Sequence, residues 1–180
     1  AAPGLMHSTV SRPENGALIL EKRQNEANIT AKMATGKQGC VWYQREVSIP
    51  GKKRGFHLIT EEITGKMPEL THIQMGIAHV HIKHTSASLA INENWDPEVR
   101  EDMEMFLTKL IPESTPFKHS CEGPDDMPAH IKACFLGNSV NVPITDGKLN
   151  LGSWQGIWLC EHRNNAGPRK VVITLQGALK

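Results

Sequence analysis

The chain has 180 residues, of which 39% are hydrophobic and 22% are charged, and its formal net charge is +1 with neutral histidines. This length favours a single globular domain, and the near-zero charge gives no global field that would attract nucleic acid or an anionic membrane. No apolar run approaches the ~18 residues of a membrane span. The four cysteines form no CxxC pair, so we expect reduced thiols and a cytoplasmic protein with neither nucleic-acid nor membrane partners.

The first part of the chain differs in texture from the rest. Residues 1–39 lack a periodic apolar pattern and contain no apolar h-region of a signal peptide. Glu14, Glu21 and Glu26 argue against an acid-poor transit peptide. We therefore expect a flexible N-terminal extension over residues 1–39, followed by a single domain over residues 40–180.

The first expected elements are a strand and a short helix. In residues 41–49, apolar side chains alternate at period two, which predicts a half-buried strand. Residues 51–55 form a loop or turn. Residues 60–70 predict a short helix, with Thr60 as its N-cap and two glutamates in its first turn.

Residues 72–91 are rich in strand patterns. The alternation slips beside Gly76, which predicts a β-bulge. After the slip, His79 and His81 occupy the face opposite Val80.

Two helices follow. Residues 97–110 predict a helix with Asp96 as its cap and Pro112 at its end. A second helix over residues 127–136 is capped by Asp125 or Asp126 and stopped by Gly137. The first helix carries an apolar stripe at helical spacing, made of Met103, Phe106, Leu107 and Leu110.

The remaining residues have β patterns. Residues 140–144 alternate, and Asp146-Gly147 is a hairpin signal. Residues 156–162 and 169–176 predict two further strands. We therefore predict an α+β fold whose β-rich, mostly antiparallel core is a sandwich or is barrel-like, with two or three helices.

The stretch HSCEGPDDMPAHIKA, residues 119–133, is the first candidate site. Asp126 and His130 are i,i+4 on one helix face, and His119 and Glu122 precede them. Together they could ligate a cation, or the carboxylate could orient an imidazole. The simpler interpretation leaves an aspartate as a helix cap and the histidines in local hydrogen bonds.

A second candidate lies in residues 79–94. His79 and His81 form an i,i+2 pair on one side of a strand, which is a metal-binding spacing in some sheets but more often a solvent-facing one. His84, Thr85 and Ser86 end a strand with hydroxyls that either hold phosphate oxygens or form a turn. The chain contains no Gly-rich phosphate cradle, which disfavours Rossmann and P-loop folds.

The third candidate is GSWQGIWLCEHR, residues 152–163. Arg163 is suited to bidentate anion binding. Trp154 and Trp158 either stack on a ligand ring or fill the core, and core filling is favoured. Cys121 and Cys134 have no evident partner for nucleophilic chemistry and are interpreted as small apolar residues.

Taken together, these blocks resemble one family. HTSASLAINENWDPEVREDME, HSCEGPDDMPAHIK and GSWQGIWLCEHR are similar to successive blocks of the YjbQ-like family, and WYQREVSIP and GFHLITEEI are similar to its N-terminal blocks. The resemblance covers residues 41–177. It implies a compact β-rich fold assembled as a homotrimer and an activity of the secondary thiamine-phosphate synthase type. That reaction joins a hydroxymethylpyrimidine diphosphate to a thiazole phosphate and releases pyrophosphate.

With this resemblance, we predict a metal-assisted enzyme that acts on a phosphorylated small molecule and uses a divalent metal, zinc or magnesium. The alternatives are a metal-dependent hydrolase and a non-catalytic trimeric binding protein for a phosphorylated metabolite. Predicted metal ligands are the histidines of the matching blocks, His119, His130, His84 and His162. Predicted catalytic residues are Glu122, Asp126 and Glu93, and predicted substrate-binding residues are Thr85, Ser86, Lys132 and Arg163.

Overall fold

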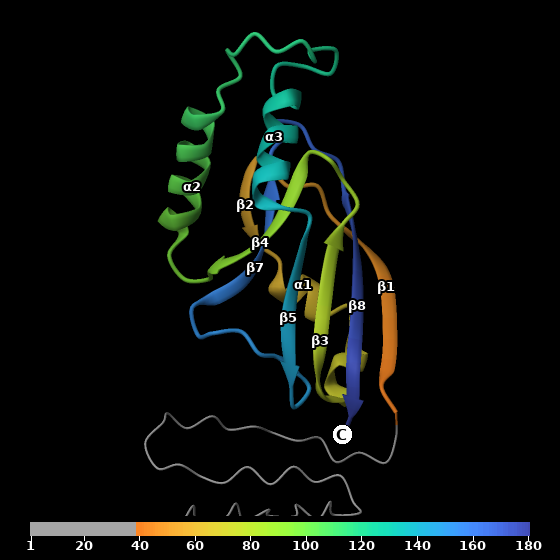
Figure 1. Cartoon of the computed structure of the whole chain (residues 1–180). Coiled ribbons are helices and arrows are strands. Elements are labelled where there is room, and N and C mark those ends of the chain that lie inside the picture. The colour runs from red at the N-terminus through yellow and green to blue at the C-terminus, as the bar shows by residue number, and fades with distance from the viewer. Residues whose placement is uncertain (1–38) are drawn as a thin grey trace, which may run out of the picture. The chain divides into compact units, whose positions relative to one another are not determined.

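The computed structural model describes residues 39–180, so the predicted extension over residues 1–39 lies almost wholly outside the described part. The described part is α+β and β-rich, as predicted, with two antiparallel sheets (Figure 1). The larger sheet has the strand order β1-β8-β3-β5-β6. Its strands are β1 (Val41–Ile49), β3 (Ile73–Ile82), β5 (Ser139–Thr145), β6 (Lys148–Leu149) and β8 (Arg169–Leu179).

The smaller sheet has the order β2-β7-β4 and supports the helices that bear on function. Helix α2 packs on β2 and helix α3 packs on β4 (Figure 1). None of the helices within residues 39–180 is long and apolar enough to cross a membrane. The strands are β2 (Gly55–Leu58), β4 (Ala87–Glu93) and β7 (Gln155–Glu161), and the helices are α1 (Thr60–Thr64), a 3-10 turn (Pro68–His72), α2 (Pro97–Leu110) and α3 (Asp126–Leu136).

Strand β7 lies between two apolar layers and positions much of the polar site. Ile157 and Leu159 pack into the core between the two sheets, whereas Trp158 and Cys160 pack toward α2. This alternation follows from the period-two geometry of a strand. The next residues therefore point to opposite sides, so Glu161 faces the larger sheet and His162 faces Ser88 of the smaller one.

The predicted strands and helices largely form, with four local differences. The helix predicted over residues 60–70 ends at Thr64, and a separate 3-10 turn follows it over Pro68–His72. Thr60 does not cap α1, because its Oγ1 instead accepts a hydrogen bond from the backbone N–H of Ile157 at 2.9 Å. Strand β2 was not predicted, because it is only four residues long. The register shift of β3 falls between Ile73 and Met75, just before Gly76 where the bulge was predicted.

The predicted apolar stripe of α2 is only half correct. Leu107 is buried and Met103 packs against the same cluster, but Phe106 and Leu110 are exposed. The cap is correct, since the Asp96 carboxylate accepts a hydrogen bond from the backbone N–H of Glu98 at 2.8 Å. Helical spacing thus predicted the helix but not how wide its buried face would be.

Candidate functional site

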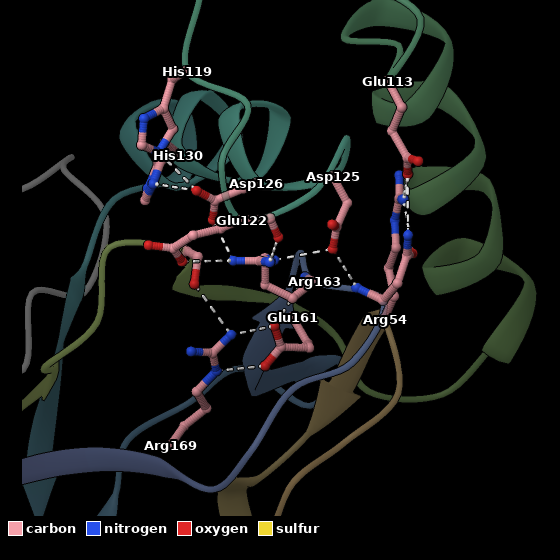
Figure 2. A network of polar contacts seen from close by, with 12 residues as sticks. Arg54, Glu113, His119, Glu122, Asp125, Asp126, His130, Glu161, Arg163 and Arg169 are labelled. Atoms are coloured by element: carbon pink, nitrogen blue, oxygen red, sulfur yellow. Dashed lines mark hydrogen bonds and ion pairs between the residues drawn. The ribbon is translucent and has the colours of Figure 1, made fainter.

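The loop before α3 folds back onto the first turn of the helix and brings two histidines to one carboxylate (Figure 2). His119 Nε2 lies 2.8 Å from Asp126 Oδ2, and His130 Nε2 lies 3.3 Å from the same oxygen. The two imidazole rings have centroids 5.4 Å apart. We call these three residues the His–Asp cluster; each offers one ligand atom, and all three atoms lie within 4.8 Å of one another.

The second oxygen of Asp126 belongs to a different interaction. Asp126 Oδ1 accepts a hydrogen bond from the guanidinium of Arg163, which follows the end of β7. Asp126 is 1% exposed, so this pairing satisfies a carboxylate that would otherwise be buried alone. The arginine fixes the orientation of the carboxylate and turns Oδ2 toward the histidines (Figure 2).

Arg163 also draws the neighbouring loop together. Its Nε donates to Asp125 Oδ2 at 3.0 Å, and its Nη2 donates to the carbonyl oxygen of Glu122 at 2.8 Å. Asp125 precedes α3 but makes no side-chain cap. Burial opposes the charge of Asp125, yet the backbone N–H of Asn164 and the Arg163 guanidinium together hold the pKa of this carboxyl below its usual value. The predicted cap is thus an ion-pair partner instead.

A buried pair beneath the cluster was not among the predicted site residues. Arg169 of β8 donates from Nε and Nη2 to the two oxygens of Glu161 at 2.6 Å each, in a bidentate pair with little exposure. Arg169 Nη2 also lies 3.3 Å from Ser86 Oγ. The only signal in the sequence was an arginine at the start of a strand, which is equally typical of a surface position.

His84 faces this buried arginine and also lines the hollow beside His130. Its Nε2 accepts a hydrogen bond from the backbone N–H of Lys170 at 2.9 Å, and its Nδ1 lies 3.3 Å from Arg169 Nη1. Burial and the positive charge of Arg169 lower the pKa of His84. Both ring nitrogens face donors, and the ligand atoms that lie within 4.8 Å of one another are those of His119, Asp126 and His130 and not those of His84.

His162 is also placed apart from the cluster. It is 1% exposed, and its Nε2 lies 2.5 Å from the hydroxyl of Ser88. Burial, followed by the charges of Lys132 and Arg54, lowers the pKa of His162 to about 3. A metal ligand needs an accessible lone pair directed at the ion, and the structure directs this imidazole into the core.

Lys132 was predicted to bind substrate, but its side chain lies inside the protein. The side chain is 1% exposed, and its Nζ lies 3.6 Å from Glu104 Oε1 and 3.4 Å from Thr108 Oγ1. Burial lowers the pKa of Lys132, although Glu104 opposes this change. The sequence did not indicate this buried position beside Glu104, because a lysine in a helix is usually exposed.

Glu93 was predicted to be catalytic and lies at the other end of the smaller sheet. It ends β4, and its Oε1 accepts from the backbone N–H of Asp96 at 3.3 Å. It lines a hollow beside Trp154, whereas the cluster lies on α3. Trp158 fills the core as predicted, but Trp154 is 62% exposed, so core filling was wrong for that residue.

Thr85 lies beside the cluster, whereas Ser86 is buried and contacts Arg169. His130 Nδ1 lies 3.0 Å from the carbonyl oxygen of Thr85, which links the strand end to α3. A hollow of about 510 Å³ opens beside this contact and is lined by Thr85, His130 and Cys134 among others. Six of the predicted site residues therefore lie together. They are His119, Glu122, Asp126, His130, Arg163 and Thr85.

The donor set of the cluster fits a divalent transition metal. Two neutral imidazoles and one carboxylate are a ligand combination of catalytic zinc sites and of other open metal sites. Magnesium is a poorer match, because it prefers oxygen ligands. Arg163 supplies the outer hydrogen bond that such a carboxylate ligand usually has.

Comparison with known sequences identifies close relatives. The family model described as "UPF0047 protein YjbQ-like" matches residues 45–178. The UPF0047 protein YjbQ of Salmonella typhimurium is 53% identical over 137 residues, which cover 76% of this chain and 99% of the relative. The protein of the same name from Escherichia coli O157:H7 is 46% identical over 137 residues, with the same coverage.

Solved structures agree with the fold. An uncharacterized conserved protein of the YjbQ/UPF0047 family from Clostridium acetobutylicum is 36% identical, with a TM-score of 0.66, and the match covers 73% of this chain and 98% of that one. A YbjQ-like protein of unknown function from Sulfolobus solfataricus has a TM-score of 0.70 at 23% identity, covering 78% and 100%. The second likeness supports the fold alone. None of these names states a reaction, so the chemistry has to be argued from the site.

Proposed function

This chain belongs to the YjbQ-like UPF0047 family, and from that premise we propose that it is a metal-assisted enzyme acting on a phosphorylated small molecule. The observation that carries the proposal is the His–Asp cluster, with three donor atoms within 4.8 Å of one another. A divalent metal ion bound there would supply a Lewis acid for a phosphate oxygen of the substrate. Zinc matches the two imidazoles and one carboxylate best.

The chain's own residues have separate roles in this proposal. Arg163 positions Asp126 and keeps its Oδ2 facing the histidines. Glu122 has a carboxylate that is 66% exposed and 3.7 Å from Arg163 Nη1, so it can exchange a proton with solvent beside the cluster. Thr85 lines the same hollow as His130, which supports a role for its hydroxyl in contacting the substrate.

Charge supports a metal-dependent mode of phosphate binding. Two arginines beside the cluster have carboxylate partners: Arg163 pairs with Asp125 and Asp126, and Arg169 pairs with Glu161. Neither guanidinium is free to neutralise an incoming phosphate. Because both arginines are already paired, we expect phosphate binding to depend mainly on the metal.

Two reactions are consistent with such a site. The family resemblance implies transfer, in which a thiazole phosphate displaces pyrophosphate from a hydroxymethylpyrimidine diphosphate. Hydrolysis is the second candidate, because the side chains of His119 and His130 are 44% and 30% exposed and water has access to the cluster. Products distinguish the two: a new C–N bond in the first case and water-dependent phosphate release in the second.

The test is turnover by zinc-loaded protein, measured as thiamine phosphate, pyrophosphate and inorganic phosphate. We expect product with the wild type and with His72→Ala, which removes an exposed imidazole elsewhere. We expect loss of at least about a hundredfold with His130→Ala. Tight binding of either substrate without turnover, unaffected by chelation, would instead indicate a binding protein and overturn the proposal.

We also propose a homotrimer in the cytoplasm. Trp42, Ile77 and Pro143 lie in one row across the outer face of the larger sheet, because Trp42 and Ile77 both pair with Gln176 and Ile77 pairs with Pro143. Trp42 and Ile77 are exposed, and Met75 extends the same face. An apolar sheet face of this kind is typical of a subunit contact. All four cysteines are free thiols, which favours a reducing compartment.

A further inference from the structure

Two tryptophans are exposed at the end of the molecule's smaller sheet where β4 leads into α2. Trp95 is 74% exposed and Trp154 is 62% exposed, and we call them the tryptophan pair. Their ring centroids are 6.0 Å apart and their planes are nearly perpendicular, at 89°. Exposed tryptophans lose favourable burial, so a pair of them held together indicates a surface that contacts something.

Hydrogen bonds from Asn94 hold together the two segments that carry the rings. The backbone N–H of Asn94 donates to the carbonyl oxygen of Trp154 at 3.0 Å. The Asn94 side-chain amide donates to the carbonyl oxygens of Ser153 at 3.2 Å and Gln155 at 2.9 Å. Trp95 itself precedes the N-cap Asp96 of a regular helix. The pair is therefore preorganised, which lowers the entropy lost when a ligand binds.

Two hollows flank the tryptophan pair, and their lining is acidic. One, of about 500 Å³, is lined by Glu93, Trp154 and Gln155 among others. The second, of about 630 Å³, shares Gln155 and is lined by Glu61, Glu62 and Trp95. Neither lining contains a lysine, arginine or histidine. Lys52 pairs with Glu62 at 2.7 Å. The other two carboxylates, those of Glu61 and Glu93, have no such lysine partner within residues 39–180.

We propose that the tryptophan pair is a binding site for a small organic cation of the methylated-ammonium class. The faces of tryptophan rings attract cations, and aromatic side chains set at an angle enclose a quaternary ammonium group, whose methyl groups shed water more easily than a lysine ammonium does. The carboxylates of the two hollows add charge complementarity. The site shares no lining residue with the His–Asp cluster or its hollow and does not depend on the proposed enzyme activity.

The test uses choline as the probe and its neutral isostere, 3,3-dimethylbutan-1-ol, as the control. Each of the four tryptophans gives one indole N–H signal in an NMR spectrum of the ¹⁵N-labelled protein. We expect choline to shift the signals of Trp95 and Trp154 saturably and to leave that of Trp42 unchanged. Trp42 is the control, because it lies on β1 and lines neither of the two hollows.

Variants make the inference specific. Trp154→Ala and Trp95→Ala should each weaken choline binding by about tenfold, whereas Trp42→Ala should not. Glu61→Gln should weaken choline binding severalfold and should not alter any binding of the neutral isostere. Equal shifts with choline and the isostere, or no saturable shift, would overturn the proposal. The proposal would also be overturned if the protein did not bind choline and Trp95→Ala formed a smaller assembly in sedimentation. That result would assign the tryptophan pair to a contact between copies of this chain.

Discussion

The two oxygens of Asp126 have different partners, and this division organises the candidate site. One oxygen meets Arg163 and the other meets both histidines. The sequence showed that Asp126 and His130 share a helix face, because they are four residues apart. It could not show Arg163 as the orienting partner, since that contact joins residues 37 apart through the tertiary fold. Nor could it show that His162 is buried, since residue type and spacing do not reveal whether a ring faces solvent or the core.

His162 gives a prediction for stability against pH. Its folded-state pKa of about 3 lies below the usual 6.5, so the folded state resists protonation and the unfolded state does not. The contribution of His162 to the free energy of unfolding is therefore complete above about pH 6.5 and is lost as pH falls toward 3. Between pH 6 and pH 4, the wild type should lose roughly 2 kcal/mol of unfolding free energy more than His162→Gln.

Chemical denaturation at several pH values measures this difference. The glutamine keeps a polar group near Ser88 but does not titrate, and the carboxylates common to both proteins cancel in the comparison. Parallel plots of unfolding free energy against pH for the two proteins would show that His162 is not buried in its neutral form.

At the scale of elements, the alternation of apolar residues predicted β1 over its observed bounds and the hairpin at Asp146-Gly147. Asp146 and Gly147 both have positive φ, as the turn signal requires. The helix stripe was less informative, because the partner of α2 is a narrow three-stranded sheet that leaves Phe106 and Leu110 outside. The width of a buried helix face depends on what it packs against, which the helix's own sequence does not contain.

Gly76 allows strands β3 and β8 to approach closely, and a side chain there should lower stability. A Cβ at Gly76 would lie 2.0 Å from the carbonyl oxygen of Gln176 and 2.8 Å from the Cα of Gly177, and both are backbone atoms. Strands β3 and β8 would have to separate, so Gly76→Ala should lower the unfolding free energy by about 1–3 kcal/mol. Gly167→Ala is the matched control, because nothing lies within 4 Å of its added Cβ. Equal stability of the two variants in urea denaturation would show that the strands are not so close.

At the scale of the whole molecule, the larger sheet covers the core with one face and leaves its other face apolar in places. The sequence predicted strands with apolar residues on alternating positions, but it did not show what covers Met75 and Ile77, which are exposed. Polar residues are the usual occupants of an outward sheet face. The trimer proposal supplies the missing cover for this face.

Two exposed methionines on different elements test whether the larger sheet forms the subunit contact. Met75 is 42% exposed on the larger sheet, and Met105 is 45% exposed on α2. Met75→Lys should shift the protein from three copies toward one in sedimentation analysis, because it places a charge in an apolar contact. Met105→Lys should leave the assembly unchanged. A wild type that sediments as a single 19.9 kDa chain would contradict the trimer.

Elemental analysis of the purified protein is the most direct test of whether His119, Asp126 and His130 hold a divalent metal. We predict about one zinc ion per chain in the wild type and in His72→Ala after dialysis. Metal should be lost from His119→Ala and from His130→Ala while circular dichroism shows both folded. Absence of metal from the wild type after incubation with zinc, or full retention of metal in both cluster variants, would show that the His–Asp cluster is not a metal site.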